Sequence, residues 1–265
     1  MTGLLPYSAK HLAAAAVLLS LCCGSARGGE RIEAASPRGI AEPLFVDGAP
    51  SPAWAVVLFA GHDGALDLDE AGPRRLRGNF LVRTQGYWAG AGMAAALFDA
   101  PADHAAGMPD TFRLSDAARQ DVAAAVALLR ARYPAARIAL MGTSRGTVTV
   151  GNVLARDPAL ADAYVMTSPV TVATRSQPGL SGMHWRGGLA QVLVLANEND
   201  GCSVSPFAAA RGMARRNGFD FRAVSSARSD GKECGGGAPH GFAGIEPQVL
   251  DTVRDWLAGV SAGRL

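Results

Sequence analysis

Several features that would indicate a membrane, a nucleic-acid partner or a disordered chain are scarce in this sequence. Lysine occurs only twice, at positions 10 and 232, and charges of both signs are interspersed to a formal net charge of +2. A nucleic-acid binder clusters its basic residues, so no nucleic-acid partner is expected. Aromatic residues make up only 6% of the chain. Hydrophobic residues nevertheless reach 49% of the 265 residues, which is enough for one globular domain with a core.

The N-terminus has the organisation of a secretory signal. Lys10 precedes an apolar run at residues 12–23, and the small residues Gly24-Ser25-Ala26 follow it. The run is shorter than the roughly 20 residues that a helix needs to cross a bilayer. We therefore expect a signal peptide at residues 1–26, an exported (periplasmic or secreted) protein and no stable membrane anchor. A retained anchor is the alternative.

Export changes the interpretation of the four cysteines. Cys22 and Cys23 fall within the expected signal peptide, although a lipid anchor on either one is an alternative. Cys202 and Cys234 remain as an even pair in an oxidising compartment, which favours a disulfide between them. The other possibility is two separate buried thiols that behave as small apolar side chains.

The order of patterns along the chain predicts a single α/β domain over residues 54–265. Residues 27–53 lack periodicity and are expected to form an irregular or β-strand segment. Short apolar runs then alternate with amphipathic helical patterns, which is typical of a mostly parallel sheet with helices on both faces. The expected strands are Trp54–Ala60, Met93–Asp99, Arg137–Thr143, Asp162–Ser168 and Gln191–Asn197, and the expected helices are Ser115–Arg132, Ser205–Asn217 and Glu246–Val260.

The central motif is Gly142-Thr143-Ser144-Arg145-Gly146, which lies between an expected strand and a helical stretch. This is the G-x-S-x-G pattern of a nucleophile elbow. The turn is so tight that side chains two residues before and after the serine would collide, which explains the glycines. Ser144 is therefore the candidate nucleophile. The string alone is a weak signal, and a purely structural Gly-Ser turn is the alternative.

A serine hydroxyl needs a base and the base needs an acid behind it. His240 lies in a loop just before the C-terminal helix, and the order Ser, acid, His is the one used by enzymes with this elbow. Asp200 follows the last expected strand and is the candidate acid, with Glu198 as the alternative. Because Cys202 is two residues from Asp200 and Cys234 is six from His240, a disulfide would tie these two loops together.

The expected oxyanion hole combines two backbone N–H groups. One is that of Arg145, directly after the nucleophile, and the other is that of His62 in the loop after the first strand. Catalysis by the His62 side chain is a competing idea. No metal or organic cofactor is implied, because the acidic stretch at residues 67–70 lacks the spacing of an EF-hand.

Together the elbow, the Gly61–Gly64 loop, Asp200 and His240 resemble the α/β-hydrolase superfamily over about residues 54–262. The strings GTSRGT, Asp-Gly-Cys and His-Gly-Phe look like a group of exported bacterial serine hydrolases. The resemblance implies an α/β-hydrolase fold, acyl-transfer chemistry and a small-molecule ester as substrate.

The expected activity is hydrolysis of carboxylic esters through an acyl-enzyme. A peptidase or amidase with the same triad, or a non-catalytic binding protein that keeps the fold, are the alternatives. The segment Pro169–Ala190 is too short and too rich in glycine and proline for a large cap domain. We expect an open site that prefers short-acyl or polar esters, including anionic ones, over long-chain lipids. Four arginines either lean toward this site or face solvent: Arg74, Arg75, Arg77 and Arg145. The oligomeric state is not predictable from these patterns.

Overall fold

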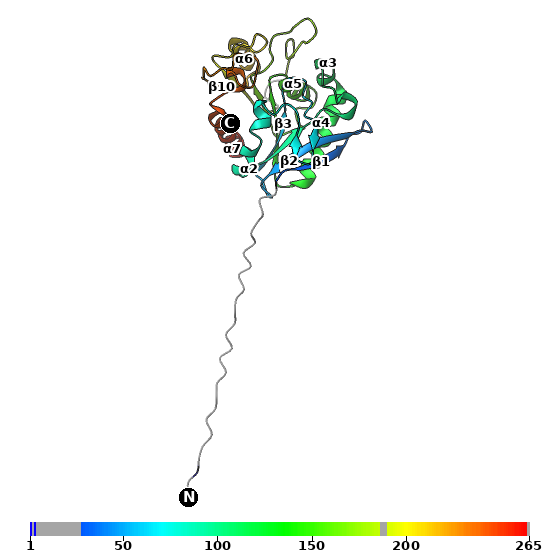
Figure 1. Cartoon of the computed structure of the whole chain (residues 1–265), viewed down its shortest axis with the longest axis vertical. Helices are drawn as coiled ribbons and strands as arrows, with labels where there is room; N and C mark the ends of the chain where they lie inside the picture. Colours follow the sequence, from blue (N-terminus) through cyan, green and yellow to red (C-terminus); the bar gives the residue numbers. More distant parts are fainter. Residues whose placement is uncertain (2, 4–27, 186–189, 264–265) are drawn as a thin grey trace.

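An eight-stranded sheet runs through the protein. The computed structural model describes residues 1, 3, 28–185 and 190–263 (Figure 1). The expected signal peptide, residues 1–26, lies outside the described residues apart from positions 1 and 3. The strand order is β1-β2-β6-β3-β7-β8-β9-β10. The strands β1 and β2 pair antiparallel with each other, β2 pairs antiparallel with β6, and every other pair is parallel. The strands are β1 (Glu30–Ala35), β2 (Ala41–Gly48), β3 (Trp54–Phe59), β6 (Ala94–Phe98), β7 (Arg137–Thr143), β8 (Ala163–Thr167), β9 (Val192–Asn197) and β10 (Asp220–Val224).

All five strands expected from apolar runs are present to within one residue at either end. They are buried along their whole length apart from Arg137, which is why continuous apolar runs encode them. The segment at 27–53 contains β1 and β2. The edge strand β10 was not expected, because most of its residues are only partly buried or exposed and its sequence is not a continuous apolar run. Two-residue strands β4 (Leu68–Asp69) and β5 (Gly72–Pro73) form a separate small ladder.

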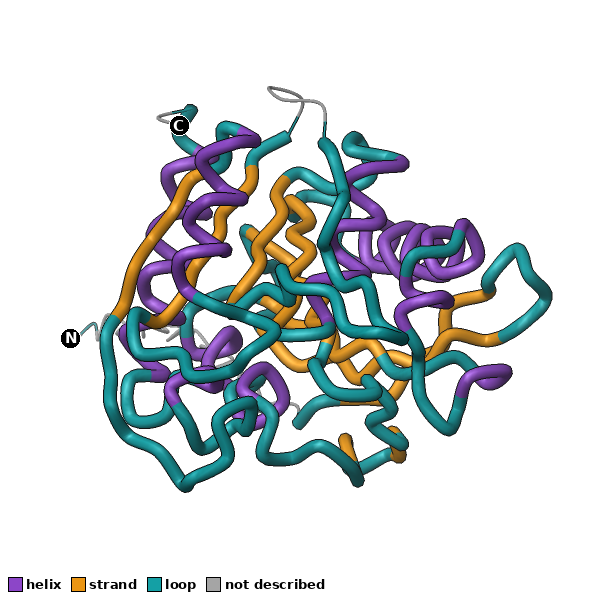
Figure 2. The backbone as a smooth tube through the Cα atoms, turned by 90° about the horizontal axis from the view of Figure 1, so that it is seen from above, coloured by secondary structure: helices purple, strands orange, loops and turns teal. Residues whose placement is uncertain are grey.

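Helices cover both faces of the sheet (Figure 2). Along β3, Ala55, Val57 and Phe59 face one buried cluster and Trp54, Val56 and Leu58 face the other. The first cluster includes residues of α4 (Asp116–Arg132), α5 (Gly146–Arg156) and α6 (Phe207–Asn217), and the second includes residues of α1 (Phe80–Arg83), α2 (Gly86–Gly90) and α7 (Glu246–Ser261). Short turns of helix also occur at η1 (Ala102–His104), α3 (Asp110–Arg113) and η2 (Pro239–Gly241).

The long helices follow their expected boundaries. Ser115 caps α4, because its hydroxyl accepts a hydrogen bond from the backbone N–H of Ala118 at 3.1 Å. The expected apolar stripes of α4 and α7 are buried; they are Val122, Val126 and Leu129 on α4 and Val249, Val253, Trp256 and Val260 on α7. The helical periodicity therefore identified the faces that pack on the sheet.

Between β8 and β9, residues 169–185 and 190–191 form neither helix nor strand. The expected loop at Pro169–Ala190 thus has no helical cap in its described part, and residues 186–189 lie outside it. No helix in the described ranges combines the length and the apolar character that crossing a bilayer would require. The carboxyl ends of the parallel strands lie at one edge of the sheet, which is where ligand sites form in open α/β sheets.

Candidate active site

Ser144 lies directly after β7 in a left-handed backbone conformation, with φ of 51°. Such a φ is uncommon for a residue with a side chain and marks a strained turn. Close contacts with the surrounding backbone enclose this turn. A Cβ on Gly142 would lie 2.5 Å from the carbonyl oxygen of Gly146, and one on Gly146 would lie 2.0 Å from that of Phe59. The N–H of Ser144 donates to the carbonyl of Thr167 at 3.0 Å. Both glycines are therefore sterically required.

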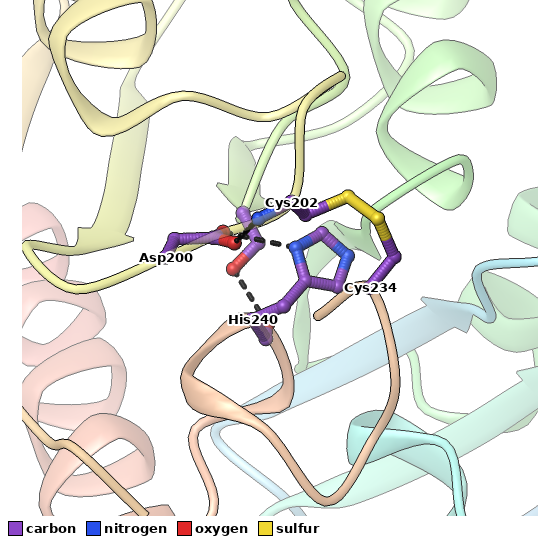
Figure 3. The surroundings of a disulfide bond; sticks show 5 residues. Asp200, Cys202, Cys234 and His240 are labelled. Atoms are coloured by element: carbon purple, nitrogen blue, oxygen red, sulfur yellow. Dashed lines mark hydrogen bonds and ion pairs between the residues drawn. A yellow bond between two sulfur atoms is a disulfide. The ribbon is translucent and has the colours of Figure 1, made fainter. Parts of the chain in front are cut away.

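His240 pairs with Asp200, and both side chains are almost completely buried (Figure 3). Nδ1 of His240 lies 2.9 Å from Oδ2 of Asp200. The other carboxylate oxygen accepts a hydrogen bond from the backbone N–H of Cys202 at 2.9 Å. Glu198, the alternative acid, is exposed. The structure thus brings Asp200, and not Glu198, to the imidazole.

The second ring nitrogen of His240 is available for proton transfer. Nε2 is buried and has no hydrogen-bond partner in the described part of the chain. With Nδ1–H donating to Asp200, a neutral imidazole leaves Nε2 as an acceptor, which is what a general base requires. A cavity of about 270 Å³ is lined by both Ser144 and His240, and also by Leu76, Asn79 and Phe80 among others. Ser144 and His240, the candidate nucleophile and base, therefore open onto the same space.

Two polar residues at strand ends hold the histidine loop in place. The hydroxyl of Ser168, directly after β8, donates to the carbonyl of His240 at 2.8 Å. The side-chain amide of Asn197, the last residue of β9, donates to the carbonyl of Pro239 at 3.1 Å. Neither residue belongs to a motif, and the expectations from sequence did not include them. The available signal was a polar residue at the carboxyl end of an otherwise apolar strand.

The other side of the same loop rests on α1. Arg83 donates to the carbonyl of Gly241 at 2.7 Å and pairs with Glu246 at 2.9 Å. Phe242 adopts a left-handed conformation with φ of 59° and is fully buried, with its ring edge-on to Phe80 at a centroid distance of 4.9 Å. The loop that carries the imidazole is therefore anchored by polar contacts and by an aromatic pair.

A disulfide joins Cys202 to Cys234 and so links the Asp200 loop to the chain that leads into His240 (Figure 3). Potential ligand atoms of Asp200, Cys202 and His240 lie within 4.8 Å of one another. This group does not suit a metal ion, because the sulfur of Cys202 is bonded to Cys234 and is not a free thiolate. The carboxylate of Asp200 is already engaged with the imidazole.

The loop after β3 lies against Ser144. A Cβ on Gly61 would lie 2.9 Å from Cβ of Ser144, so no side chain fits at that position. His62 follows with φ of 56°. No hydrogen bond within the described residues uses the backbone N–H of His62 or of Arg145. Two free N–H groups near the serine are the donors that an oxyanion hole needs. The His62 side chain is 75% exposed, which argues against its use as a base.

The four arginines expected near the site are all engaged by the protein itself. Arg145 pairs with buried Asp110 at 2.5 Å and also donates to the side-chain oxygen of Gln177. The others contact acceptors of their own loop: Arg74 lies 3.5 Å from Asp67, Arg75 lies 2.9 Å from Asp63, and Arg77 donates to the carbonyl of Pro73 at 2.8 Å. Carboxylates of the protein therefore pair with Arg74, Arg75 and Arg145, whereas Arg77 contacts a neutral carbonyl.

Comparison with known proteins gives similarity at the level of structure. Neither a family model nor a curated protein matches the sequence. An α/β serine hydrolase without a lid from Xanthomonas campestris is 14% identical, with a TM-score of 0.56 over 86% of this chain and 94% of that one. Esterase 2 from Thermogutta terrifontis is 16% identical, with a TM-score of 0.60 over 90% and 94% of the two chains. This chain has the α/β-hydrolase fold.

A third similar structure comes from a study of two prolyl endopeptidases. It is 18% identical, with a TM-score of 0.56, and the match covers 88% of this chain but 38% of that longer one. At these identities the similarity concerns the fold. Within the α/β-hydrolase fold the nucleophile stands on the turn from a strand into a helix. Ser144 occupies such a turn between β7 and α5.

Proposed function

We propose that this protein is a serine hydrolase that cleaves carboxylic esters, with a preference for short-acyl or polar substrates. Ser144 is the nucleophile, His240 the general base and Asp200 the acid that orients it. The observation that carries the proposal is the shared cavity: a serine on a strained elbow and a buried His–Asp pair open onto the same space of about 270 Å³. Nucleophile, base and orienting acid are the parts that acyl transfer requires.

The reaction follows from these positions. Oγ of Ser144 attacks the ester carbonyl carbon while its proton passes to Nε2 of His240. The carbonyl oxygen becomes an oxyanion and accepts hydrogen bonds from the N–H groups of His62 and Arg145. The bond to the alcohol then breaks, and the alcohol leaves with the proton from His240. A water molecule, deprotonated by His240, then attacks the carbonyl carbon of the acyl-enzyme. The bond to Oγ of Ser144 breaks, the acid is released, and His240 returns the proton to Oγ.

Asp200 contributes through charge and through orientation. Its carboxylate accepts the hydrogen bond from Nδ1 of His240, which fixes the tautomer and stabilises the imidazolium that forms in each step. The backbone N–H of Cys202 holds the other oxygen of that carboxylate, so the acid itself is positioned. This arrangement supports a base that is oriented before the substrate binds.

Covalent labelling tests the proposal directly. A fluorophosphonate probe should label the protein at Ser144, and Ser144→Ala should remove the label and lower ester hydrolysis by at least about 10⁴-fold, because the attacking oxygen is lost. Ser181→Ala, at an exposed serine, is the matched control and should behave like the parent. A parent that is neither labelled nor active on a panel of nitrophenyl esters would indicate a binding protein that keeps the fold.

A peptidase or amidase is the second candidate, and the similarity to the prolyl endopeptidase structure is the observation that favours it. The same triad can cleave ester and amide bonds, so only measured rates on the two kinds of substrate distinguish an esterase from an amidase. Rates on an ester and an anilide with the same acyl group separate the two. We expect the ester to be the better substrate, and a higher kcat/KM on the anilide would assign an amidase.

We also infer that residues 1–26 are a signal peptide and that the mature protein is exported. The Cys202–Cys234 disulfide supports this, because such bonds persist in oxidising compartments. Protein from a secreting host should have the intact mass of a chain that begins near Arg27. A mass that retains Met1, with the protein in the membrane fraction, would contradict the inference.

A further inference from the structure

Arg113 is a fully buried arginine that the proposed reaction does not use. Its exposed fraction is 0%, although arginine is among the residue types that are almost never fully buried unless paired. No carboxylate oxygen in the described residues lies within ion-pair distance of it, since the neighbouring Asp110 pairs with Arg145 instead. Burial, followed by the charge of Arg145, lowers the pKa of Arg113 to about 10, so the guanidinium stays protonated at neutral pH.

The guanidinium joins three segments that surround the nucleophile. Nε donates to the carbonyl of Met108 at 3.1 Å, and Nη1 donates to the hydroxyl of Thr149 on α5 at 3.1 Å. Nη2 makes a longer contact of 3.5 Å with the carbonyl of His62. A Cβ on Gly64 would lie 2.4 Å from Nη2, so the 61–64 turn lies directly on the guanidinium. Arg113 therefore supports the loop whose N–H group is proposed to bind the oxyanion.

The second proposed donor is held from the same turn of helix. Asp110, three residues before Arg113 on α3, pairs with the side chain of Arg145 and accepts a hydrogen bond from the backbone N–H of Gly179 at 2.9 Å. The α3 turn thus contacts both residues that supply the free N–H groups, through Arg113 to His62 and through Asp110 to Arg145.

We propose that Arg113 is a positioning residue for the oxyanion hole, an inference that rests on the proposed function. Its fork of donors holds the 61–64 turn against α5, and its charge lies against the turn whose N–H group is proposed to bind the oxyanion. Arg145 offsets the charge of Asp110, and Arg75 offsets that of Asp63, so neither of these nearby carboxylates forms an ion pair with Arg113 in the described part of the chain. A fixed positive charge in a buried setting stabilises an oxyanion more than it stabilises the neutral ester.

Two variants test the proposal. Arg113→Met removes both the charge and the fork, and Arg113→Lys keeps the charge but cannot reach His62 and Thr149 together. On nitrophenyl acetate, kcat should fall about 100-fold for Arg113→Met and about 10-fold for Arg113→Lys, with KM nearly unchanged, since an oxyanion interaction acts mainly in the transition state. Arg156→Met is the matched control, because Arg156 also donates to a carbonyl near α3, that of Leu114, but lies outside the site. It should keep the parent kcat.

Inhibition by trifluoroacetone separates a loss of oxyanion binding from a general loss of packing. Addition of Ser144 to this ketone forms an oxyanion, so its inhibition constant should rise in parallel with the loss of kcat in both variants. Unchanged kcat and inhibition constants, or changes confined to KM, would overturn the inference. If Arg113→Met does not fold, the kcat and inhibition constant of Arg113→Lys test the inference instead. An inactive parent would overturn the proposed function and this inference together, whereas an active parent with unaffected variants would overturn this inference alone.

Discussion

Oδ2 of Asp200 lies 2.9 Å from Nδ1 of His240, and neither side chain is more than 4% exposed. The carboxylate is the only acceptor positioned to fix the tautomer of the ring among the described residues. Asp200→Asn should therefore lower kcat by about 10⁴-fold, because an amide can donate to Nδ1 and leave the proton on the wrong nitrogen. Steady-state kinetics on a nitrophenyl ester would measure the loss, with circular dichroism to show that the fold is retained.

The matched control for this variant is Glu198→Gln. Glu198 lies two residues earlier on the same loop, but it is exposed and its backbone N–H pairs with the carbonyl of Val224. Its neutralisation should leave kcat within about twofold of the parent, since an exposed surface charge contributes little. A larger loss for Glu198→Gln than for Asp200→Asn would reverse the assignment of the acid.

The disulfide predicts a response to reductant. Loss of the Cys202–Cys234 bond frees two loops, one bearing Asp200 and the other leading to His240. Dithiothreitol should lower the kcat of the parent at temperatures where its circular dichroism spectrum is unchanged. The Cys202→Ser/Cys234→Ser double variant should have a similarly low kcat and no response to reductant. Closure of a loop with a sequence separation of 32 contributes about 3–4 kcal/mol in the chain-entropy estimate, so the variant should also unfold at lower urea. Full kcat in reduced parent would show that the bond does not support the site.

Glu42 on β2 predicts an unusual dependence of stability on pH. Its side chain is fully buried, and neither carboxyl oxygen has a hydrogen-bond partner in the described part of the chain. Burial, followed by the nearby carboxylates of Asp121 and Asp99, raises the pKa of Glu42 to about 10, and the charge of Arg38 opposes this only in part. The group is therefore neutral in the folded protein at pH 7 but ionised in the unfolded chain.

The sign of the effect follows from that difference. The folded pKa is above the unfolded one, so the contribution of Glu42 to stability is complete below about pH 4.5 and is lost as the pH rises toward 10. Glu42→Gln mimics the protonated carboxyl, so its free energy of unfolding should equal that of the parent near pH 4.5. Above that pH it should exceed the parent value increasingly, by up to about 3 kcal/mol at pH 7. Urea unfolding between pH 5 and 9 measures this. Glu33→Gln, at an exposed position of β1, should differ from its parent by a similar small amount at every pH. If the free energy of unfolding changed by the same amount at every pH for both variants, Glu42 would not be neutral in the folded protein.

The parts of the fold that the sequence predicts are those with redundant signals. Buried parallel strands such as β7 are apolar on both faces, and α4 combines a 3.6-residue period with a cap at Ser115. The elbow at Ser144 is predictable because its sterics leave no alternative to glycine at two positions. By contrast β10 is a half-exposed edge strand whose residues form no apolar run, so neither period nor composition marks it.

The contacts that support the site are harder to predict, because they join single residues far apart in the chain. Ser168 and Asn197 hold the histidine loop through one hydrogen bond each. Arg113 and Glu42 are ionisable residues in fully buried positions, which is the reverse of what their residue types indicate. Such residues are recognised only when the fold shows what surrounds them.

The shape of the site predicts a preference for acyl groups of a particular chain length. The segment between β8 and β9 contributes no helix in its described part, so no cap of that kind covers the serine there. The cavity at Ser144 and His240 holds about 270 Å³, with Leu76 and Phe80 as its apolar walls. A small space of this kind suits a short acyl group, whereas a long chain would have to lie outside it in water and would gain little from burial.

Nitrophenyl esters from acetate to palmitate test this preference. We expect kcat/KM to be highest for the shortest acyl groups and to fall by about tenfold or more at palmitate. Burial of a methylene contributes about 0.8 kcal/mol only where the methylene contacts the protein, and the cavity is too small to contact a long chain. The Ser144→Ala variant, assayed in parallel, corrects for spontaneous hydrolysis and for adsorption of the long esters. Detergent concentrations below and above the micellar range show whether an interface changes the rate. A maximum at palmitate together with activation at the interface would mean that a long apolar surface forms beside Ser144 when lipid is present, and the protein would then be a lipase with a site that the resting structure does not display.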